Sequence, residues 1–142
     1  MRIFVDANLL FSAAKSDGAI RQLLQLLRRA GHKLVVDGYV LEEARRNLAH
    51  KFPAGVQVLE ALVPTLELVG THADNLALVS KLPLPDKDKP VLLAAIAARC
   101  QALVTGDQTH FGPLFGQRVG GVDIYSPRTL AEQILAGPRT RK

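Results

Sequence analysis

Acidic side chains at the ends of apolar runs are the residues of this chain that could do chemistry. Asp6 follows the strand-like run Arg2–Val5, and Asp107 follows a second such run. Because the carboxyl ends of parallel strands share one edge of a sheet, we expect both carboxylates there, with Glu43 and Asp88 as candidates to join them. Converging carboxylates repel one another unless a cation lies between them, and oxygen-rich sites suit Mg²⁺ or Mn²⁺. The pattern therefore predicts a metal-dependent phosphodiesterase.

Each acid also has a purely structural explanation. Asp6 could be the N-cap of a following helix, although Asn8 could take that position and leave Asp6 free for a cation. Asp107 could be an ordinary turn residue after Gly106. Thr105 could orient a carboxylate or a metal-bound water from behind, or it could be a strand residue whose hydroxyl is satisfied elsewhere. No single acid decides between these readings, but their joint arrangement favours a metal site.

Helix geometry selects between neighbouring acids at two positions. At 100° per residue, Glu43 lies roughly 110° from the centre of the apolar stripe of a helix over 40–48, and Glu42 lies about 150° from it. Glu43 is therefore on the shoulder of the helix, where it can reach a cleft, whereas Glu42 points to water. Asp88 shares a face with the apolar residues that follow it, while Asp86 projects away. Either aspartate could instead cap the helix.

Size and composition set the class of protein. The chain has 142 residues, 48% of them hydrophobic, which suits one domain with a packed core. Its formal net charge is +5, and the basic excess grows further if four acids bind a cation. Such an excess attracts polyanions, including nucleic acids.

Cysteine content and hydropathy bear on the compartment. Cys100 is the one cysteine, so no intrachain disulfide can form, and a reducing cytoplasm is the simplest expectation. Because Cys100 ends an apolar helix, we expect a buried thiol rather than a nucleophile. No run approaches the roughly 18 to 20 apolar residues that span a bilayer. We therefore expect a cytoplasmic protein without a membrane segment.

Strand-like and helix-like patterns alternate along the chain. The expected strands are 2–5, 34–36, 66–69, 102–105 and 122–125, and the expected helices are 20–30, 40–48, 56–63, 75–82, 90–100 and 127–135. This alternation predicts a three-layer α/β/α sandwich with a central, mostly parallel sheet of four to five strands. We expect a single domain over 1–136 and a basic, frayed tail over 137–142.

Four segments together carry a resemblance to a known family. They are 4–10 (Phe-Val-Asp-Ala-Asn-Leu-Leu), 41–48 (Leu-Glu-Glu-Ala-Arg-Arg-Asn-Leu), 86–92 (Asp-Lys-Asp-Lys-Pro-Val-Leu) and 103–107 (Leu-Val-Thr-Gly-Asp). In order and spacing they resemble the PIN domain, in particular the single-domain ribonucleases that include VapC-type toxins. The resemblance implies Mg²⁺ or Mn²⁺ as cofactor and single-stranded RNA as substrate. It marks Asp6, Glu43, Asp88 and Asp107 as the catalytic, metal-binding cluster.

The resemblance also implies partners and products. A stand-alone domain of this kind is often the toxin of a type II pair, covered by a small antitoxin, and often a homodimer. Helices over 20–27 and 56–63 could supply a dimer surface, or could equally be core. Hydrolysis by metal-activated water would leave a 5′-phosphate and a 3′-hydroxyl. Candidates to position RNA phosphates are Lys15, Arg45, Arg46, Lys87 and Lys89.

Some features depart from the family pattern. Several relatives carry a further acid shortly after the last aspartate, where this chain has Gln108, Thr109 and His110. His110 could contact RNA or a metal-bound water, but a surface or half-buried histidine is favoured. Phe111 and Phe115 are expected to anchor this segment in the core rather than to stack on bases.

Two other classes of function compete with a nuclease. The first is a catalytically idle RNA- or protein-binding module of the same fold, which the presence of all four acids disfavours. The second is another α/β phosphohydrolase or a receiver domain. A haloacid-dehalogenase-like phosphatase would carry Asp-x-Asp after the first strand, where this chain has Asp6-Ala7-Asn8.

Overall fold

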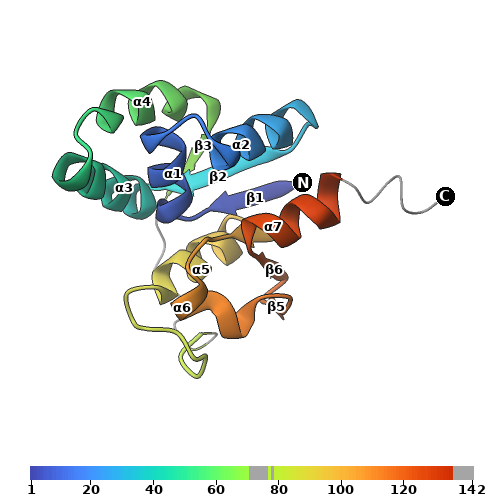
Figure 1. Cartoon of the computed structure of the whole chain (residues 1–142). Helices are drawn as coiled ribbons and strands as arrows, with labels where there is room; N and C mark the ends of the chain where they lie inside the picture. Colours follow the sequence, from blue (N-terminus) through green and yellow to red (C-terminus); the bar gives the residue numbers. More distant parts are fainter. Residues whose placement is uncertain (71–76, 78, 136–142) are drawn as a thin grey trace.

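A six-stranded sheet forms the centre of the molecule (Figure 1). The computed structural model of the chain describes residues 1–70, 77 and 79–135. The strands are β1 (Arg2–Val5), β2 (Lys33–Asp37), β3 (Glu67–Val69), β4 (Ala102–Val104), β5 (Arg118–Val119) and β6 (Val122–Tyr125). Their order across the sheet is β3-β2-β1-β4-β6-β5, and all are parallel except β5, which pairs antiparallel with β6.

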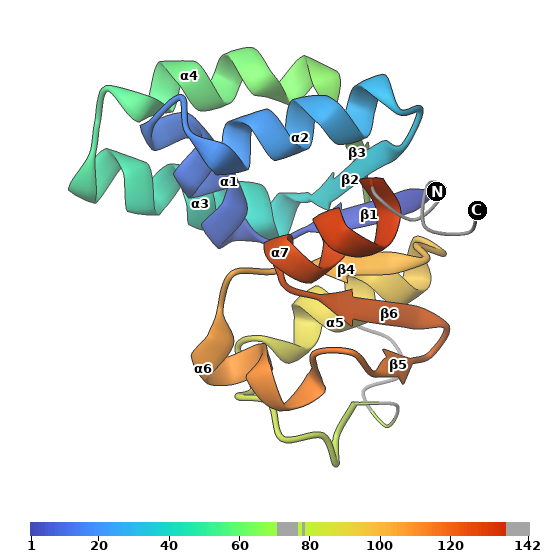
Figure 2. The ribbon, with the colours of Figure 1, turned by 45° about the vertical axis from the view of Figure 1, so that its right-hand side comes forward.

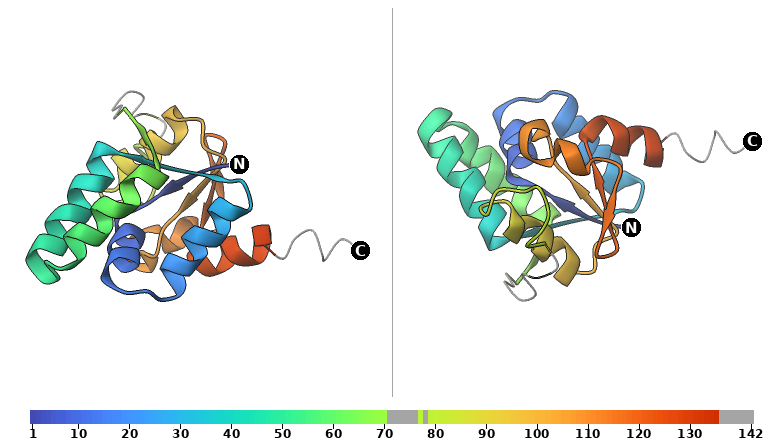
Figure 3. Two further views of the ribbon diagram at one scale, coloured as in Figure 1. Left: turned by 90° about the horizontal axis from the view of Figure 1, so that it is seen from above. Right: turned by 90° about the horizontal axis from the view of Figure 1, so that it is seen from below.

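Helices cover both faces of this sheet. They are α1 (Ala7–Lys15), α2 (Ala19–Arg29), α3 (Gly38–Lys51), α4 (Gly55–Leu62), α5 (Lys89–Ala97), α6 (Gln108–Phe111) and α7 (Pro127–Leu130), with 3₁₀ turns η1 (Val63–Thr65) and η3 (Gly112–Leu114) and a π-helical turn η4 (Ala131–Leu135). Figures 2 and 3 show α1, α2 and α7 on one face and α5 on the other. The α3–α4 pair packs on α1. The three-layer α/β/α sandwich expected from the sequence is confirmed.

The core follows from burial of the strands on both faces. Ile3, Phe4 and Val5 of β1 and Leu103 and Val104 of β4 are all 0% exposed. Continuous apolar runs of this kind are expected in a parallel sheet that carries helices on both sides. Cys100 is buried, as expected, and burial raises its thiol pKa to about 11. Within the described part of the chain, no helix has the length and apolar character needed to cross a membrane.

Glycines end one helix and turn one hairpin. Gly31 has a φ of +92° just after α2, and the next amide, His32 N–H, donates to Leu27 O at 3.1 Å, which closes the helix. Gly120 and Gly121, with φ of +57° and +85°, form the two-residue turn between β5 and β6. A side chain at Gly120 would also meet Ile96 Cδ1 at 2.7 Å.

Several boundaries differ from the sequence-based expectation. The expected helix over 75–82 falls mainly outside the described residues, and residues 79–81 form a turn instead of a helix. The helix expected to reach Cys100 ends at Ala97, because Arg99 adopts a left-handed φ of +58°. The helix expected over 127–135 is α-helical only to Leu130. Neither α1 nor the two-residue strand β5 was predicted, and with β5 the sheet has six strands instead of the expected four to five.

Candidate metal centre at the carboxyl edge of the sheet

The acids predicted from the sequence come from four different elements. Asp6 directly follows β1 and is the N-cap of α1, and Asp107 lies just after β4 and is the N-cap of α6. Asp88 precedes α5, while Glu43 lies within α3. Because β1 and β4 are paired neighbours, Asp6 and Thr105 continue the two strands side by side, and Asp6 N–H donates to Val104 O at 3.1 Å.

Thr105 and Asn8 connect the two strand ends through hydrogen bonds. Thr105 Oγ1 is fully buried; it donates to Asp6 Oδ2 at 2.8 Å and accepts the Asp107 amide at 3.1 Å. Asn8 Nδ2 donates to Thr105 Oγ1 at 3.2 Å, and Asn8 Oδ1 accepts Gly106 N–H at 2.9 Å. One donor and two acceptor positions of the hydroxyl are thus used. The sequence allowed Asn8 to be the N-cap of α1, but Asp6 holds that position.

Asp6 is the most buried of the four acids. Its Oδ1 accepts the Ala7 amide at 2.7 Å, and its residue exposure is 6%. Burial raises the pKa of Asp6 to about 6, against the opposing hydrogen bonds from Thr105 and Ala7, and the charges of Glu43 and Asp88 raise it further. Such a carboxylate is costly to ionise in the absence of a nearby cation.

Among the described residues, one group of potential metal ligands consists of Asp88, Asp107 and His110. One ligand atom from each lies within 4.8 Å of the others. His110 Nδ1 is 2.8 Å from Asp107 Oδ2 and 3.1 Å from Asp88 Oδ2. Burial raises the pKa of Asp88; the charge of Asp107 adds to this effect, whereas His110 and Lys87 oppose it.

Among the described residues, two atoms of this group have no hydrogen-bond partner. Asp88 Oδ2 and His110 Nδ1 are both buried, and neither makes a hydrogen bond of acceptable geometry, although they lie close together. Asp88 stands at the N-cap position of α5 but accepts no capping bond. A buried polar atom without a partner is costly. Two carboxylates and an imidazole with unused lone pairs fit a divalent cation.

Glu43 and Asp6 stand beside this group rather than in it. Within the described residues, neither belongs to the set whose ligand atoms lie within 4.8 Å of one another. Burial raises the pKa of Tyr39, and the charges of Glu43 and Asp6 add to this increase. Both acids therefore lie near Tyr39. Tyr39 lies one helical turn before Glu43 in α3 and donates from its hydroxyl to Lys87 O at 2.6 Å. Tyr39 thus ties α3 to the segment that carries Asp88.

The exposure of competing acids agrees with the helix geometry inferred from the sequence. Glu43 is half-buried, whereas Glu42 is exposed. The side chain of Asp88 is 14% exposed, compared with 98% for Asp86. The sequence analysis missed a further acid at this edge: Asp37 ends β2, is 1% exposed and caps α3 by accepting the Val40 amide.

The candidate RNA-binding side chains fall into three groups. Arg45 forms two hydrogen bonds with Glu60 of α4, at 2.7 and 3.1 Å, and Lys89 pairs with Asp86 at 3.2 Å. Lys15 ends α1, at the opposite end of that helix from Asp6. Arg46 and Lys87 lie nearer the acids: Arg46 lowers the pKa of Tyr39, and Lys87 lowers that of Asp88.

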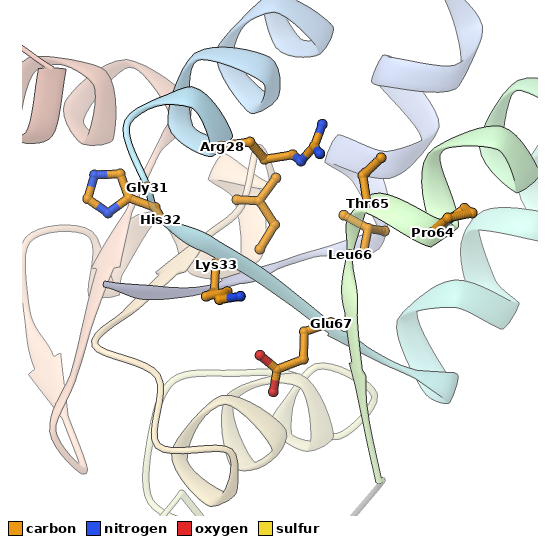
Figure 4. Close-up of a pocket in the computed structure, with 9 residues that line it drawn as sticks. Arg28, Gly31, His32, Lys33, Pro64, Thr65, Leu66 and Glu67 are labelled. Carbon is orange, nitrogen blue, oxygen red and sulfur yellow. The ribbon is translucent and has the colours of Figure 1, made fainter.

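A sizeable cavity lies away from these acids. It measures about 520 Å³ and is lined by residues that include Arg28, Lys33 and Glu67 (Figure 4). Lys33 and Glu67 begin β2 and β3, so this cavity opens at the amino edge of the sheet, opposite the acids. The buried ligand atoms, not the size of a cavity, identify the candidate metal centre.

Fold and side chains together define the class of protein. This is an α/β/α sandwich whose carboxyl sheet edge carries carboxylates and a histidine able to hold a divalent cation. A sequence profile described as the PIN domain matches residues 2–109. The chain therefore belongs to the PIN domain family, as its four motifs predicted.

Solved structures share the fold at low sequence identity. VapBC2 from Rickettsia felis, bound to a DNA fragment from the promoter, has a TM-score of 0.68 and 16% identity, covering 89% of this chain and 98% of the matched chain. VapBC-1 from nontypeable Haemophilus influenzae gives 0.63 and 11%, covering 90% and 99%. VapC20 from Mycobacterium tuberculosis, described as a sarcin-ricin loop cleaving toxin, gives 0.58 and 13%, covering 82% and 98%. No curated protein matches the sequence.

Proposed function

We propose that this chain is a divalent-metal-dependent endoribonuclease that hydrolyses phosphodiester bonds of single-stranded RNA. We further propose that it is the toxin of a type II toxin–antitoxin pair and acts in the cytoplasm. The observation that carries the proposal is the group formed by Asp88, Asp107 and His110, with Asp6 and Glu43 beside it, in a chain of the PIN domain family. The net charge of +5 supports a polyanionic substrate.

The proposed roles follow from the positions of the side chains. Asp88 and Asp107 would hold the Mg²⁺ or Mn²⁺ ion, with Asp6 and Glu43 contributing directly or through waters. Thr105 fixes the Asp6 carboxylate by its 2.8 Å hydrogen bond and the Asp107 backbone by another of 3.1 Å, so both acids keep their orientation. When bound, the cation supplies Lewis acidity, activating water and offsetting negative charge at the phosphate.

We assign substrate positioning to basic side chains near the acids. Arg46 and Lys87 are the candidates with electrostatic effects on residues of the site. Arg45 and Lys89 already pair with acids, so we expect smaller contributions from them. Each would bind backbone phosphates and would not contribute to sequence specificity.

The first test measures cleavage of a labelled single-stranded RNA. Wild type should cleave with Mn²⁺ or Mg²⁺, leaving 5′-phosphate ends, and a chelator should abolish cleavage. Asp107→Asn should lower the rate by at least about a hundredfold, because it removes a charged ligand from the ion. Asp86→Asn is a matched control, since this aspartate is 98% exposed and lies two residues from Asp88.

The outcomes separate the alternatives. Cleavage that survives the chelator would refute the metal mechanism. An Asp107→Asn variant as active as wild type, when both are folded, would show that these acids are not catalytic. Metal binding without turnover on any RNA would favour the idle binding module. Hydrolysis of small phosphoesters but not RNA would favour another α/β phosphohydrolase.

We also propose a small antitoxin as partner and a homodimer as the assembled state. The solved structures that share the fold include VapBC assemblies. On α2, Leu23, Leu24 and Leu27 are buried, while Leu26 is 46% exposed and so available for a contact. Light scattering of wild type and Leu26→Glu tests the homodimer: a monomeric wild type would refute it. Toxicity relieved by co-expression of the neighbouring small gene would support the antitoxin.

A further inference from the structure

The one-turn helix α6 brings a nitrogen ligand to the acids. Asp107 caps this helix by accepting the His110 amide on Oδ1 at 3.0 Å, which leaves Oδ2 facing the imidazole. Phe111, the next residue, is 0% exposed and anchors the turn in the core. The hydrogen bond from the His110 amide to Asp107 and the buried side chain of Phe111 therefore keep the imidazole next to the Asp107 carboxylate.

The spacing of the three ligand atoms matches the coordination shell of one ion. Two adjacent ligands of an octahedral cation with bonds of about 2.1 Å lie about 3.0 Å apart. His110 Nδ1 is 2.8 Å from Asp107 Oδ2 and 3.1 Å from Asp88 Oδ2. Both distances lie close to that edge length. The distance from the nitrogen to each carboxylate oxygen is thus about that between neighbouring ligands of one metal ion.

Hydrogen bonding does not account for this spacing. His110 Nδ1 and Asp88 Oδ2 are buried and make no hydrogen bond with suitable geometry among the described residues. An imidazole that only paired with a carboxylate would direct its N–H at one oxygen. Here the nitrogen lies within 3.1 Å of one oxygen from each carboxylate, as three ligands around a common centre would.

We infer that His110 Nδ1 coordinates the same divalent ion as Asp88 and Asp107, and that this nitrogen makes the site prefer Mn²⁺ to Mg²⁺. The inference rests on the metal site of the proposed function but adds a ligand and a selectivity to it. Mg²⁺ strongly prefers oxygen ligands, whereas affinities for nitrogen-containing sites rise along the first transition series. An all-carboxylate site would discriminate less between the two ions.

Calorimetric titration of the metal-free full-length chain with MnCl₂ or MgCl₂, without RNA, tests the selectivity. Wild type should bind Mn²⁺ at least about tenfold more tightly than Mg²⁺. His110→Ala should weaken Mn²⁺ binding by about tenfold or more and change Mg²⁺ binding far less. His110→Asp, which replaces nitrogen with a carboxylate, should strengthen Mg²⁺ binding relative to Mn²⁺ binding and so reduce the preference for Mn²⁺. His50→Ala is the matched control, because His50 is exposed near the end of α3.

Electron spin-echo modulation of bound Mn²⁺ tests the bond itself. Wild type should show modulation from a coordinated imidazole ¹⁴N, and His110→Ala should lose it while His50→Ala keeps it. Nitrogen modulation that persists in His110→Ala would overturn the inference.

The titrations can also overturn it in ways that leave the proposed function distinguishable. If His110→Ala binds both ions more tightly, His110 is only a neighbouring positive charge and not a ligand. If both affinities are unchanged, His110 has no role in binding, and the nuclease proposal stands without it. If wild type binds neither ion, the metal site itself fails.

Discussion

Burial of the ionised Asp6 carboxylate destabilises the folded chain when no cation is near. Burial raises the pKa of Asp6 to about 6, above its ordinary 3.8, so the folded chain holds this proton more tightly than the unfolded chain does. The metal-free protein therefore loses stability as the pH rises from about 3.8 to about 6, by up to about 3 kcal/mol, and the loss is complete above that range. A neighbouring cation would remove this cost by favouring the carboxylate.

Asp6→Asn should separate stability from metal binding. With a chelator at pH 7.5, the variant should be more stable than wild type by up to about 3 kcal/mol, and the difference should shrink toward pH 4. Urea unfolding at the two pH values measures this, and comparing variant with wild type cancels the other titrating groups. Adding Mn²⁺ should stabilise wild type more than the variant. A variant less stable than wild type at pH 7.5 would contradict the assigned cost of burying this charge.

Tyr39 offers a second test on the scale of single residues. Tyr39→Phe removes the 2.6 Å hydrogen bond to Lys87 O, the link between α3 and the segment before Asp88. We expect a stability loss of about 1 kcal/mol and a severalfold weaker Mn²⁺ affinity, since Asp88 would be held less firmly. Urea unfolding and calorimetry measure the two effects. Unchanged affinity despite the lost stability would show that the link does not position Asp88.

Which site residues the sequence could predict depends on how local their geometry is. Strand ends placed Asp6 and Asp107 at one edge, and helix angles distinguished half-buried Glu43 from exposed Glu42. Those inferences need only a few neighbouring residues. Tyr39 was missed because its partner lies 48 residues away in the chain. His110 was set aside because its closeness to Asp88 depends on how α6 and α5 pack, which no periodicity reveals.

On the scale of elements, α6 is short, but with its N-cap it supplies two of the three grouped ligands, Asp107 and His110. Phe111→Ala should cost about 3 to 5 kcal/mol, because it empties a fully buried site, and should also weaken Mn²⁺ binding by freeing the turn that carries Asp107 and His110. Phe115→Ala is the control, since Phe115 is only half-buried and lies beyond η3. Thermal unfolding and metal titration measure both. Normal metal affinity in folded Phe111→Ala would mean that the cap alone orients the turn.

Elements with strong local signals were predicted, and those decided by packing were not. Gly31 at the end of α2 and the Ser126–Pro127 start of α7 follow directly from capping rules. Strand β5 has two residues, too few for an alternating pattern, and exists because Gly120 and Gly121 turn the chain back on β6. The π-helical turn after α7 similarly replaces a helix that the sequence pattern extends to Leu135.

On the scale of the whole molecule, net charge and its local arrangement should control RNA binding. In an Asp107→Asn background, which should suppress turnover, affinity for single-stranded RNA should fall linearly with salt on logarithmic axes, with a slope of about −0.7 for each phosphate contact. Arg46→Ala and Lys87→Ala should each reduce the slope by about 0.7, because both charges act at the candidate metal centre. Fluorescence anisotropy across a salt series measures the slope directly. Arg45→Ala and Lys15→Ala are matched controls that should leave the slope nearly unchanged, since Arg45 pairs with Glu60 and Lys15 lies at the far end of α1. Equal effects from all four variants would mean that RNA responds to the total charge of the protein rather than to a path across the carboxyl edge of the sheet.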